Sequence, residues 1–241
     1  MKGIILSGGS ATRLRPCTKV TSKQLLPVYN RPMIYYPLNT LIKAGIKDIL
    51  IIVAPVQAGD YLNLLGSGKQ FGVKFTYEIQ EKPAGLAEAF IIGRNFIGQD
   101  DVTMILGDNI FEDDFSRQIK NFKKGAKIFT KEVHDPSRFG VAELWKNLRV
   151  ISLEEKPAVP KSNFCVTGLY ICDNRVVDIA KEIRPSARGE LEITDVMKWY
   201  LNKKELQAEM VKGAWIDAGT FDSLLEAQIF AKSRLQDKFV I

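Results

Sequence analysis

The sequence of 241 residues is poor in histidine and cysteine, and these shortages exclude several kinds of chemistry. Its single histidine, His134, is followed by an Asp-Pro pair, a combination typical of a turn. A histidine metal cluster and a histidine-dependent nucleophilic triad are therefore excluded. The three cysteines, Cys17, Cys165 and Cys172, match no metal-binding spacing and predict no disulfide framework, which indicates a reducing compartment.

The chain also lacks long apolar runs and dense basic tracts. No apolar run approaches the length of about 18 residues that a membrane span requires, and the apolar stretch after Lys2 is too short for a secretory signal. The net charge of +6 suits anionic ligands, but the lysines are scattered and mark no nucleic-acid tract. These features predict a cytoplasmic protein that binds neither membranes nor nucleic acid.

Apolar residues are abundant, and their pattern predicts an α/β protein. With 46% hydrophobic residues the chain can build one large globular domain. Apolar, strand-like runs alternate with helical stretches in the first half, which favours a mostly parallel sheet covered by helices. We expect strands at 3–6, 49–54, 73–79, 102–106, 126–131, 141–144, 150–153 and 164–172. We expect helices at 32–44, 59–65, 85–96, 190–201 and 220–232.

The loop after the first expected strand has the composition of a phosphate-binding segment. Gly8 and Gly9 have no Cβ, so backbone N–H groups there can approach phosphate oxygens closely. Arg13 and Arg15 add positive charge with the fork geometry that suits phosphate. The spacing fits neither a Walker loop nor the Rossmann dinucleotide fingerprint. By itself, the loop fits either a phosphate cradle or a tight turn with two surface arginines.

Polar groups also follow other strand-like segments, where open parallel sheets bind their ligands. Asp108 and Asp217 both lie at such strand ends, where an aspartate by itself is more often a cap or turn residue than a ligand. Together with a phosphate loop they form a candidate Mg²⁺ site, because Mg²⁺ takes one or two carboxylates along with water and substrate phosphates. Lys23 and Lys156 lie at the ends of segments that should return to the same edge, although either alone could be a surface lysine.

Several motifs occur in the order that is typical of one enzyme family. They read Gly-Ile-Ile-Leu-Ser-Gly-Gly-Ser-Ala-Thr-Arg-Leu-Arg-Pro at 3–16, Ser-Lys-Gln-Leu-Leu-Pro-Val-Tyr at 22–29, Leu-Gly-Asp-Asn-Ile-Phe at 106–111, Arg-Phe-Gly-Val-Ala at 138–142, Glu-Glu-Lys-Pro at 154–157, Val-Thr-Gly-Leu-Tyr at 166–170, Arg-Gly-Glu-Leu-Glu-Ile-Thr-Asp-Val at 188–196 and Trp-Ile-Asp-Ala-Gly-Thr at 215–220. With these motifs the chain resembles the sugar-1-phosphate nucleotidylyltransferases, and among them the short form of the glucose-1-phosphate thymidylyltransferases.

The resemblance implies a fold, a reaction and partners. The fold would be a single-domain, Rossmann-like, three-layer α/β fold with a mostly parallel, mixed central sheet of the nucleotide-diphospho-sugar transferase type. The reaction would convert glucose-1-phosphate and dTTP into dTDP-glucose and pyrophosphate with Mg²⁺, as a step of nucleotide-sugar and polysaccharide biosynthesis. The protein would be a homo-oligomer. Long members carry a regulatory site in additional C-terminal helices, and we expect a single nucleotidyltransferase domain over residues 1–241 without that region.

The resemblance also implies roles for individual residues. The catalytic residues would be Arg13, Lys23, Asp108 and Lys156. The nucleotide would contact Leu6, Gly8, Gly9, Arg13, Lys23, Gln24, Gln80, Pro83, Gly85 and Asp108. The sugar phosphate would contact Asn109, Phe139, Gly140, Glu155, Lys156, Val166, Thr167 and Arg188. The Mg²⁺ ligands would be Asp108 and Asp217.

Two positions depart from the family pattern. Ala11 stands where the family usually has glycine, so a left-handed backbone there would be strained and could weaken phosphate binding. Phe139 stands where many members have tyrosine, which removes a hydroxyl from the sugar side and could shift the choice of sugar.

Alternatives stay open at this point. The base could be thymine, uracil or cytosine, because Gln80 could form hydrogen bonds with each. A glycosyltransferase that consumes a nucleotide sugar would share the fold class, but it usually carries a paired Asp-x-Asp, whereas Asn109 and Ile110 follow Asp108 here. A non-catalytic subunit that binds nucleotide sugars is a further possible function.

Overall fold

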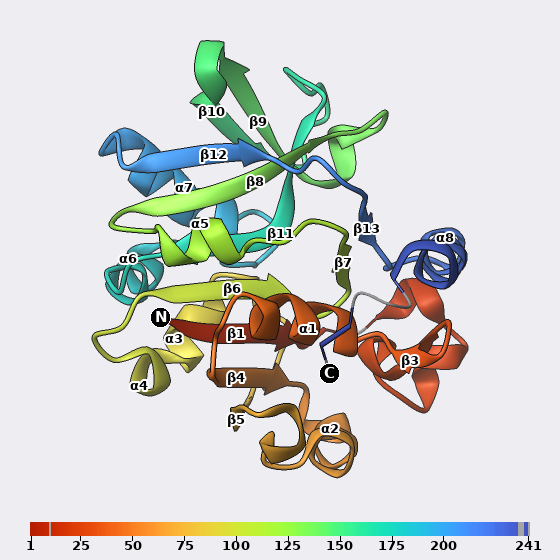
Figure 1. Cartoon of the computed structure of the whole chain (residues 1–241). Helices are drawn as coiled ribbons and strands as arrows, with labels where there is room; N and C mark the ends of the chain where they lie inside the picture. Colours follow the sequence, from red (N-terminus) through yellow and green to blue (C-terminus); the bar gives the residue numbers. More distant parts are fainter. Residues whose placement is uncertain (10, 236–238, 241) are drawn as a thin grey trace. The chain divides into compact units, whose positions relative to one another are not determined.

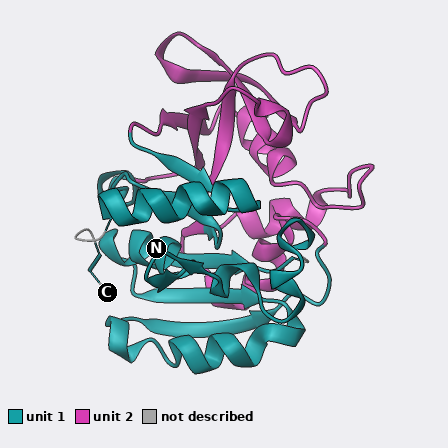
Figure 2. Cartoon of the chain, turned by 90° about the vertical axis from the view of Figure 1, so that its right-hand side faces the viewer, with its two compact units in different colours: residues 1–83, 105–121, 213–241 teal, residues 84–104, 122–212 magenta. Residues whose placement is uncertain are grey.

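The computed structural model describes residues 1–9, 11–235 and 239–240 (Figure 1). The described chain forms two compact units, shown in teal and magenta in Figure 2. Unit 1 comprises residues 1–83, 105–121 and 213–241, and unit 2 comprises residues 84–104 and 122–212. Strand β6 (Val102–Leu106) contributes residues to both units. The single domain over residues 1–241 without a C-terminal regulatory region stays a prediction.

Unit 1 is built on parallel strands. In it β1 (Lys2–Ser7) pairs with β4 (Asp48–Val53), and β4 pairs with β5 (Lys74–Ile79). Most of β1 and β4 is buried, as expected for parallel strands that are covered on both faces. The helices of unit 1 are α1 (Tyr35–Lys43), α2 (Ala58–Leu65), α5 (Ser116–Lys120) and α8 (Phe221–Phe230). Its short strands pair as β2 (Pro27–Val28) with β3 (Arg31–Pro32), and as β7 (Asn109–Phe111) with β13 (Trp215–Asp217).

The carboxyl ends of the unit 1 strands lie in register. The last pair of β1 and β4 is Ser7 with Val53. The Gln80 N–H, just after β5, donates to the carbonyl of Val53 at 2.9 Å, and the Gly107 N–H, just after β6, donates to the carbonyl of Leu6 at 2.9 Å. The segments that begin at residues 8, 80 and 107 therefore leave the strands at one edge, where open parallel sheets bind ligands.

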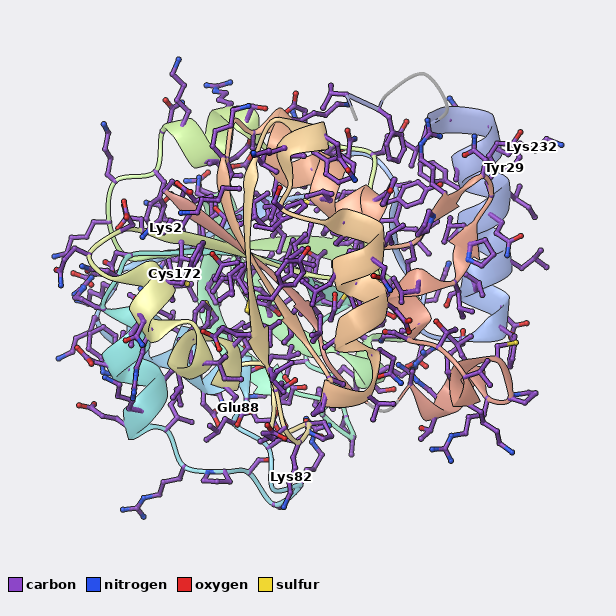
Figure 3. All side chains as sticks on the ribbon, turned by 90° about the horizontal axis from the view of Figure 1, so that it is seen from below. Lys2, Tyr29, Lys82, Glu88, Cys172 and Lys232 are labelled. Atoms are coloured by element: carbon purple, nitrogen blue, oxygen red, sulfur yellow. The ribbon has the colours of Figure 1, made fainter. Side chains whose placement is uncertain are left out.

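Unit 2 is mostly antiparallel. Strand β8 (Ala126–Glu132) pairs antiparallel with β11 (Phe164–Cys172) and parallel with β12 (Leu206–Met210). Strand β9 (Gly140–Trp145) pairs antiparallel with β10 (Arg149–Glu155) and with β11. The helices of unit 2 are α3 (Glu88–Ile92), α4 (Arg94–Ile97), α6 (Val176–Glu182) and α7 (Ile193–Asn202). Cys165 and Cys172 are buried on β11, where Figure 3 labels Cys172, and Cys17 is exposed.

The fold class is confirmed as a Rossmann-like α/β fold with a mixed central sheet. The predicted strand at 164–172 coincides with β11, and the other predicted strands overlap observed ones. The single helix predicted over 85–96 is wrong, because Gly85 has a φ of +109° and Gly93 separates α3 from α4. The predicted helix start at Pro32 is also wrong, since that residue pairs in β3. Helices α5 and α6 and strand β12 were not expected from the sequence.

Helix ends follow local capping signals. Thr220 caps α8: its Oγ1 accepts from the Ser223 N–H at 3.3 Å, and the Ser223 Oγ accepts from the Thr220 N–H at 3.1 Å. Thr220 is therefore the N-cap, and α8 begins at Phe221, one residue after the predicted start. Helix α7 begins at Ile193 rather than at 190, because Glu192 still has extended backbone. None of the helices within the described residues is both long enough and apolar enough to cross a membrane.

Candidate functional site

The loop after β1 adopts a conformation that demands small residues. Gly9 has a φ of +105° and Ala11 has a φ of +45°. A Cβ placed on Gly8 would lie 2.1 Å from Oε1 of Gln80, so glycine leaves the room that this glutamine occupies. Thr18 Oγ1 donates to the carbonyl of Ala11 at 2.7 Å and helps to hold the left-handed backbone. Ala11 therefore has the strained conformation expected at this departure from the family pattern.

Arg13 is held at the edge of the loop by its neighbour Leu14. Both belong to the short 3₁₀ turn η1 (Thr12–Leu14), in which Leu14 is fully buried and Arg13 is exposed. Leu14 belongs to the same core cluster as the residues on either side of Asp217. A Cβ placed on Gly219 would lie 2.7 Å from Oδ1 of Asp217 and 2.9 Å from Nη2 of Arg13. The guanidinium and the carboxylate thus share the space beside this glycine.

Lys23 forms an ion pair with Asp108, the buried carboxylate at the end of β6. The Lys23 Nζ donates to Oδ2 of Asp108, and Asn109 Nδ2 donates to Oδ1 at 3.2 Å. Burial by itself would raise the pKa of Asp108, but the charge and hydrogen bond of Lys23 and the hydrogen bond of Asn109 hold that pKa below its ordinary value. Asp108 is therefore a carboxylate at neutral pH.

Asp217 acts on the same lysine as Asp108. Burial lowers the pKa of Lys23, but the attraction of Asp108 and Asp217 outweighs burial and raises the pKa above its ordinary value. The strand pairing explains the proximity, because Asp217 lies opposite Asn109 and the Ala218 N–H donates to the carbonyl of Asp108 at 3.0 Å. Two carboxylates far apart in the sequence are thereby brought to one place in unit 1.

This donor set fits a hard cation that takes further ligands from water or substrate. Mg²⁺ is commonly held by one or two carboxylates, with water and phosphate oxygens completing its shell. Within residues 1–9, 11–235 and 239–240, no group of three or more His, Cys, Asp or Glu side chains is placed to hold a metal ion. Asp108 and Asp217 therefore suit Mg²⁺ bound together with phosphates, and they do not suit a closed structural zinc site.

The remaining residues predicted to contact the nucleotide divide between the units. In unit 1, Leu6, Gln24 and Gln80 are buried, with 6%, 2% and 5% of their surface exposed. Pro83 is exposed on the loop after β5, where Figure 3 shows the neighbouring Lys82 at the outer end of the loop. Gln80 is thus the inward-facing residue at the start of this loop.

Gly85 belongs to unit 2 and is required there by close backbone contact. Its φ is +109°, and a Cβ placed on it would lie 2.4 Å from the backbone N and O of Leu191. The Leu191 N–H donates to the carbonyl of Ala84 at 2.7 Å, and the Ala87 N–H donates to the carbonyl of Leu191 at 3.1 Å. Any side chain at Gly85 would disrupt these two backbone hydrogen bonds to Leu191.

Unit 2 gathers four of the residues predicted to bind the sugar phosphate. A Cβ placed on Gly140 would lie 3.1 Å from Oγ1 of Thr194, 3.4 Å from Oε2 of Glu155 and 3.8 Å from Cβ of Val166. The Thr194 hydroxyl donates to Oε2 of Glu155. Arg188 Nη2 lies 3.4 Å from Oε1 of the same glutamate. Gly140, Val166, Thr194 and Arg188 therefore surround the carboxylate of Glu155. Contact of this cluster with a sugar phosphate stays a prediction.

Lys156 and Phe139 lie next to this cluster. The Lys156 N–H donates to the carbonyl of Phe139 at 3.0 Å, and its Nζ lies 3.9 Å from Oε1 of Glu155. The Lys156 side chain is 43% exposed, so its charge is available to an anionic ligand. Its φ of +43° is unusual for a lysine and turns the chain sharply after β10.

Two predicted sugar-phosphate residues are engaged elsewhere. Thr167 is fully buried, and its hydroxyl donates to the carbonyl of Phe129 at 3.0 Å within the sheet of unit 2. Asn109 lies in unit 1, where it contacts Asp108 and its Oδ1 accepts from Nε1 of Trp215 at 2.6 Å. Contact of either residue with the sugar phosphate stays a prediction.

Sequence reasoning missed Glu192 and Thr194, which orient the unit 2 cluster. Glu192 is 4% exposed and accepts from Arg188 Nη2 at 2.8 Å on each of its oxygens and from Ser186 Oγ at 2.6 Å. Burial by itself would lower the pKa of Arg188, but Glu192 outweighs it and raises the pKa. The available signal was the motif at 188–196, in which the polar residues Glu190, Glu192 and Thr194 alternate with apolar ones.

Comparison with known proteins then decides the family. Residues 2–234 match the family described as nucleotidyl transferase. This chain belongs to the nucleotidyl transferase family. A glucose-1-phosphate thymidylyltransferase of Neisseria meningitidis is 52% identical to it over 239 residues, which cover 97% of this chain and 83% of that protein. A glucose-1-phosphate thymidylyltransferase of Mycobacterium tuberculosis is 51% identical over 238 residues, with the same coverage of 97% and 83%.

Solved structures agree with this family membership. A Bacillus anthracis structure described as a glucose-1-phosphate thymidylyltransferase with sucrose superposes with a TM-score of 0.91 at 48% identity, covering 97% of this chain and 96% of that one. A UDP-glucose pyrophosphorylase with UDP-glucose superposes with a TM-score of 0.85 at 25% identity, covering 97% and 99%. Nucleotidyl transferases of different base specificity thus share this fold.

Proposed function

We propose that this nucleotidyl transferase is a glucose-1-phosphate thymidylyltransferase, which converts glucose-1-phosphate and dTTP into dTDP-glucose and pyrophosphate. The observation that carries the proposal is the cluster of Arg13, Lys23, Asp108 and Asp217 beside a glycine loop in unit 1. Two cations and two carboxylates suit a triphosphate bound with Mg²⁺. Relatives named for thymidylyl transfer are 52% and 51% identical, against 25% for the UDP-glucose enzyme, which favours thymine.

The proposed reaction needs no general base. An oxygen of the sugar phosphate is already an anion; it forms a bond to the α-phosphorus while the bond to pyrophosphate breaks. This agrees with a chain whose single histidine, His134, is exposed in a turn. Bringing anions together is the main difficulty, so positioning and electrostatic stabilisation should dominate catalysis.

Unit 1 would bind and activate the triphosphate. Arg13 would bind phosphate oxygens as negative charge grows on the leaving pyrophosphate. Asp108 and Asp217 would hold Mg²⁺, which when bound neutralises phosphate charge and polarises the phosphoryl oxygens. Lys23 and Asn109 orient the carboxylate of Asp108 for this task. Gln80, packed against Gly8, would contact the base.

Unit 2 would bind the sugar phosphate. Lys156 would hold the phosphate, and Glu155 would accept hydrogen bonds from sugar hydroxyls. Gly140 leaves space beside that carboxylate, and Phe139 offers an apolar ring where many members offer a hydroxyl. Homo-oligomer formation and a cytoplasmic location stay predictions.

A pyrophosphate-release assay tests the proposal. Glucose-1-phosphate with Mg²⁺ would be mixed in turn with dTTP, UTP and CTP. We expect release with dTTP to be fastest and to stop when the metal is chelated. A glycosyltransferase or a non-catalytic binding subunit releases no pyrophosphate, so the absence of release from every pair would contradict the proposal.

A further inference from the structure

A buried chain of hydroxyl groups in unit 1 ends on Gln24. Tyr61, on α2, is fully buried, and its hydroxyl lies 2.8 Å from Oγ of Ser22. Ser22 Oγ in turn donates to Oε1 of Gln24 at 2.6 Å. The Tyr61 hydroxyl also lies 3.3 Å from the same amide oxygen. We refer to Tyr61, Ser22 and Gln24 as the hydroxyl relay.

The proton count fixes the direction of the hydroxyl relay. Each hydroxyl has one proton: Ser22 donates its proton to Oε1 of Gln24, and Tyr61 donates its proton to Ser22 or to the same amide oxygen. Burial raises the pKa of Tyr61 to about 12, so the phenol keeps the proton that it donates. The amide oxygen of Gln24 is therefore held toward the two hydroxyls, and its amide nitrogen is turned away from them.

The amide nitrogen of Gln24 is the side-chain group that the two hydroxyls leave available to a ligand. Gln24 is 2% exposed, and none of the residues that the structure describes accepts a hydrogen bond from its Nε2. Its backbone is fixed, because its carbonyl accepts from the Ile34 N–H at 2.8 Å. Its neighbour Lys23 pairs with Asp108, and a Cβ placed on Gly107 would lie 2.9 Å from Cγ of Gln24. An N–H donor at this edge that no described protein acceptor satisfies gains most from an acceptor on a bound molecule.

We propose that Tyr61, acting through Ser22, is a positioning residue that fixes Gln24 as a hydrogen-bond donor to an acceptor oxygen of the bound nucleotide. The inference rests on the proposed function and deepens it. The acceptor is a carbonyl oxygen of the base or an oxygen of the triphosphate, since both accept from an amide N–H. Without the relay the amide can turn over and present its oxygen, which repels both kinds of acceptor.

Tyr61→Phe removes the first donor of the hydroxyl relay and keeps the aromatic ring. We expect the KM for dTTP to rise about three- to tenfold, because the variant loses one neutral hydrogen bond that orients the Gln24 amide. The kcat should hardly change. Tyr36→Phe is the matched control. Tyr36 is also a buried tyrosine of unit 1, and its hydroxyl donates to the carbonyl of Val28 at 2.7 Å. The control should leave the KM for dTTP unchanged.

A double-mutant cycle separates positioning from a general structural role. If Tyr61 acts through the amide, Tyr61→Phe adds nothing to the KM once Gln24→Ala has removed that amide. Thermal unfolding of each variant establishes that it is folded. An equal additional rise of KM in the Gln24→Ala background would overturn the proposal, and so would a Tyr61→Phe protein that matches the Tyr36→Phe control.

Calorimetry with dTTP and with inorganic tripolyphosphate identifies the acceptor without depending on turnover. If Tyr61→Phe weakens the binding of both ligands, the Gln24 amide donates to a phosphate oxygen. If it weakens only dTTP, the amide donates to the base. Unchanged affinity for both ligands would overturn the hydroxyl relay. A wild-type protein that releases no pyrophosphate would instead contradict the proposed function, and the binding measurements would still decide the relay.

Discussion

The two site clusters differ in how far their charged side chains are exposed to water. In unit 1, the side chains of the ion pair Lys23–Asp108 are only 17% and 9% exposed, and Asp217 acts on the same lysine. In unit 2, the side chains of Lys156 and Arg188 are 43% and 37% exposed. Charges removed from water interact strongly and are fixed before a ligand arrives, whereas exposed charges are screened. In the proposed function, the unit 1 cluster would therefore stabilise developing charge, and the unit 2 cluster would hold a substrate.

Unit 2 does bury a charged network, but that network connects secondary structure. Asp173 is 6% exposed and accepts from the Tyr200 hydroxyl at 2.9 Å, the Gly125 N–H at 2.8 Å and Arg175 Nη2 at 2.6 Å. Arg175 also bonds Glu205 at 2.6 Å. A buried carboxylate by itself does not mark a functional site. Their partners distinguish Asp108, at a glycine-lined strand edge, from Asp173, which directly follows β11 and accepts a hydrogen bond from Tyr200 of α7.

The largest expected effect is on turnover in unit 1. Asp108→Asn should lower the rate of pyrophosphate release by roughly 100- to 1,000-fold, because a preorganised charge is lost at the reacting phosphates. The protein should stay folded, since Asp217 still compensates Lys23. Steady-state assays and circular dichroism check both statements. Asp48→Asn is the control, because Asp48 is exposed at the opposite end of β4. Near wild-type turnover in Asp108→Asn would contradict the proposed difference between the two clusters.

Asp173→Asn should show the reverse behaviour. It should destabilise the protein by about 2 kcal/mol, because charge-assisted hydrogen bonds to a buried carboxylate are weakened, and it should leave kcat of the remaining folded protein unchanged. Urea unfolding measures the loss. Asp178→Asn breaks an exposed pair with Lys181 on α6 and should cost less than about 1 kcal/mol. Equal stability of the two variants would contradict the assignment of Asp173 as a structural residue.

The pH dependence of this stability has a definite sign. Burial alone would raise the pKa of Asp173, but hydrogen bonds from Arg175, Gly125 and Tyr200 hold it below its ordinary value. A carboxyl whose pKa is lowered by folding adds stability that is fully present above its unfolded pKa, about 3.9, and is lost as the pH falls through the folded pKa. The difference between wild type and Asp173→Asn should therefore shrink when urea unfolding is repeated below about pH 4. A constant difference would contradict this linkage.

A smaller effect is expected for the exposed cation of unit 2. Lys156→Ala should raise the KM for glucose-1-phosphate about tenfold and change the KM for dTTP little, because a partly screened charge contributes to binding one substrate. Initial-rate kinetics with each substrate varied in turn measure this. Lys161→Ala, on an exposed loop of the same unit, is the control. A loss of turnover as large as that of Asp108→Asn would remove the difference between the two clusters.

The smallest effect is expected at Ala11. Ala11→Gly should relieve about 1 kcal/mol of left-handed strain, and the greater freedom of glycine in the unfolded chain offsets about 0.4–1 kcal/mol of it. The free energy of unfolding should therefore stay within about 0.5 kcal/mol of wild type. Ala89→Gly, in helix α3 with ordinary helical backbone, should instead lose about 1 kcal/mol or more. Equal losses at both positions would show that the backbone of Ala11 is not strained.

The elements that the sequence predicted well are those whose signal is local. Strand β11 is a mostly apolar run, and the start of α8 is fixed by a capping box between Thr220 and Ser223, three residues apart. The failures depend on distant contacts. Gly85 could not be placed without Leu191, whose backbone occupies the space of a side chain there. Strand β12 is half polar, so it becomes a strand only through its pairing with β8.

The candidate site residues also divide into those with a local sequence signal and those that depend on distant contacts. Residues that contribute charge from a recognisable motif, such as Arg13, Lys23 and Asp108, could be selected from the sequence. Partners that orient them could not, because their role depends on tertiary proximity. Tyr61 reads as a core residue of an amphipathic helix, and only the structure places its hydroxyl beside Ser22.

The rate of pyrophosphate release by Arg13→Ala, with glucose-1-phosphate and dTTP both saturating, tests the central assignment most directly. Arg13 shares the space beside Gly219 with Asp217, so removing its guanidinium should leave the triphosphate bound and its developing charge uncompensated. We predict a fall of roughly 100- to 1,000-fold in a folded protein. A rate close to that of the wild type would contradict the role of the unit 1 cluster in activating the triphosphate.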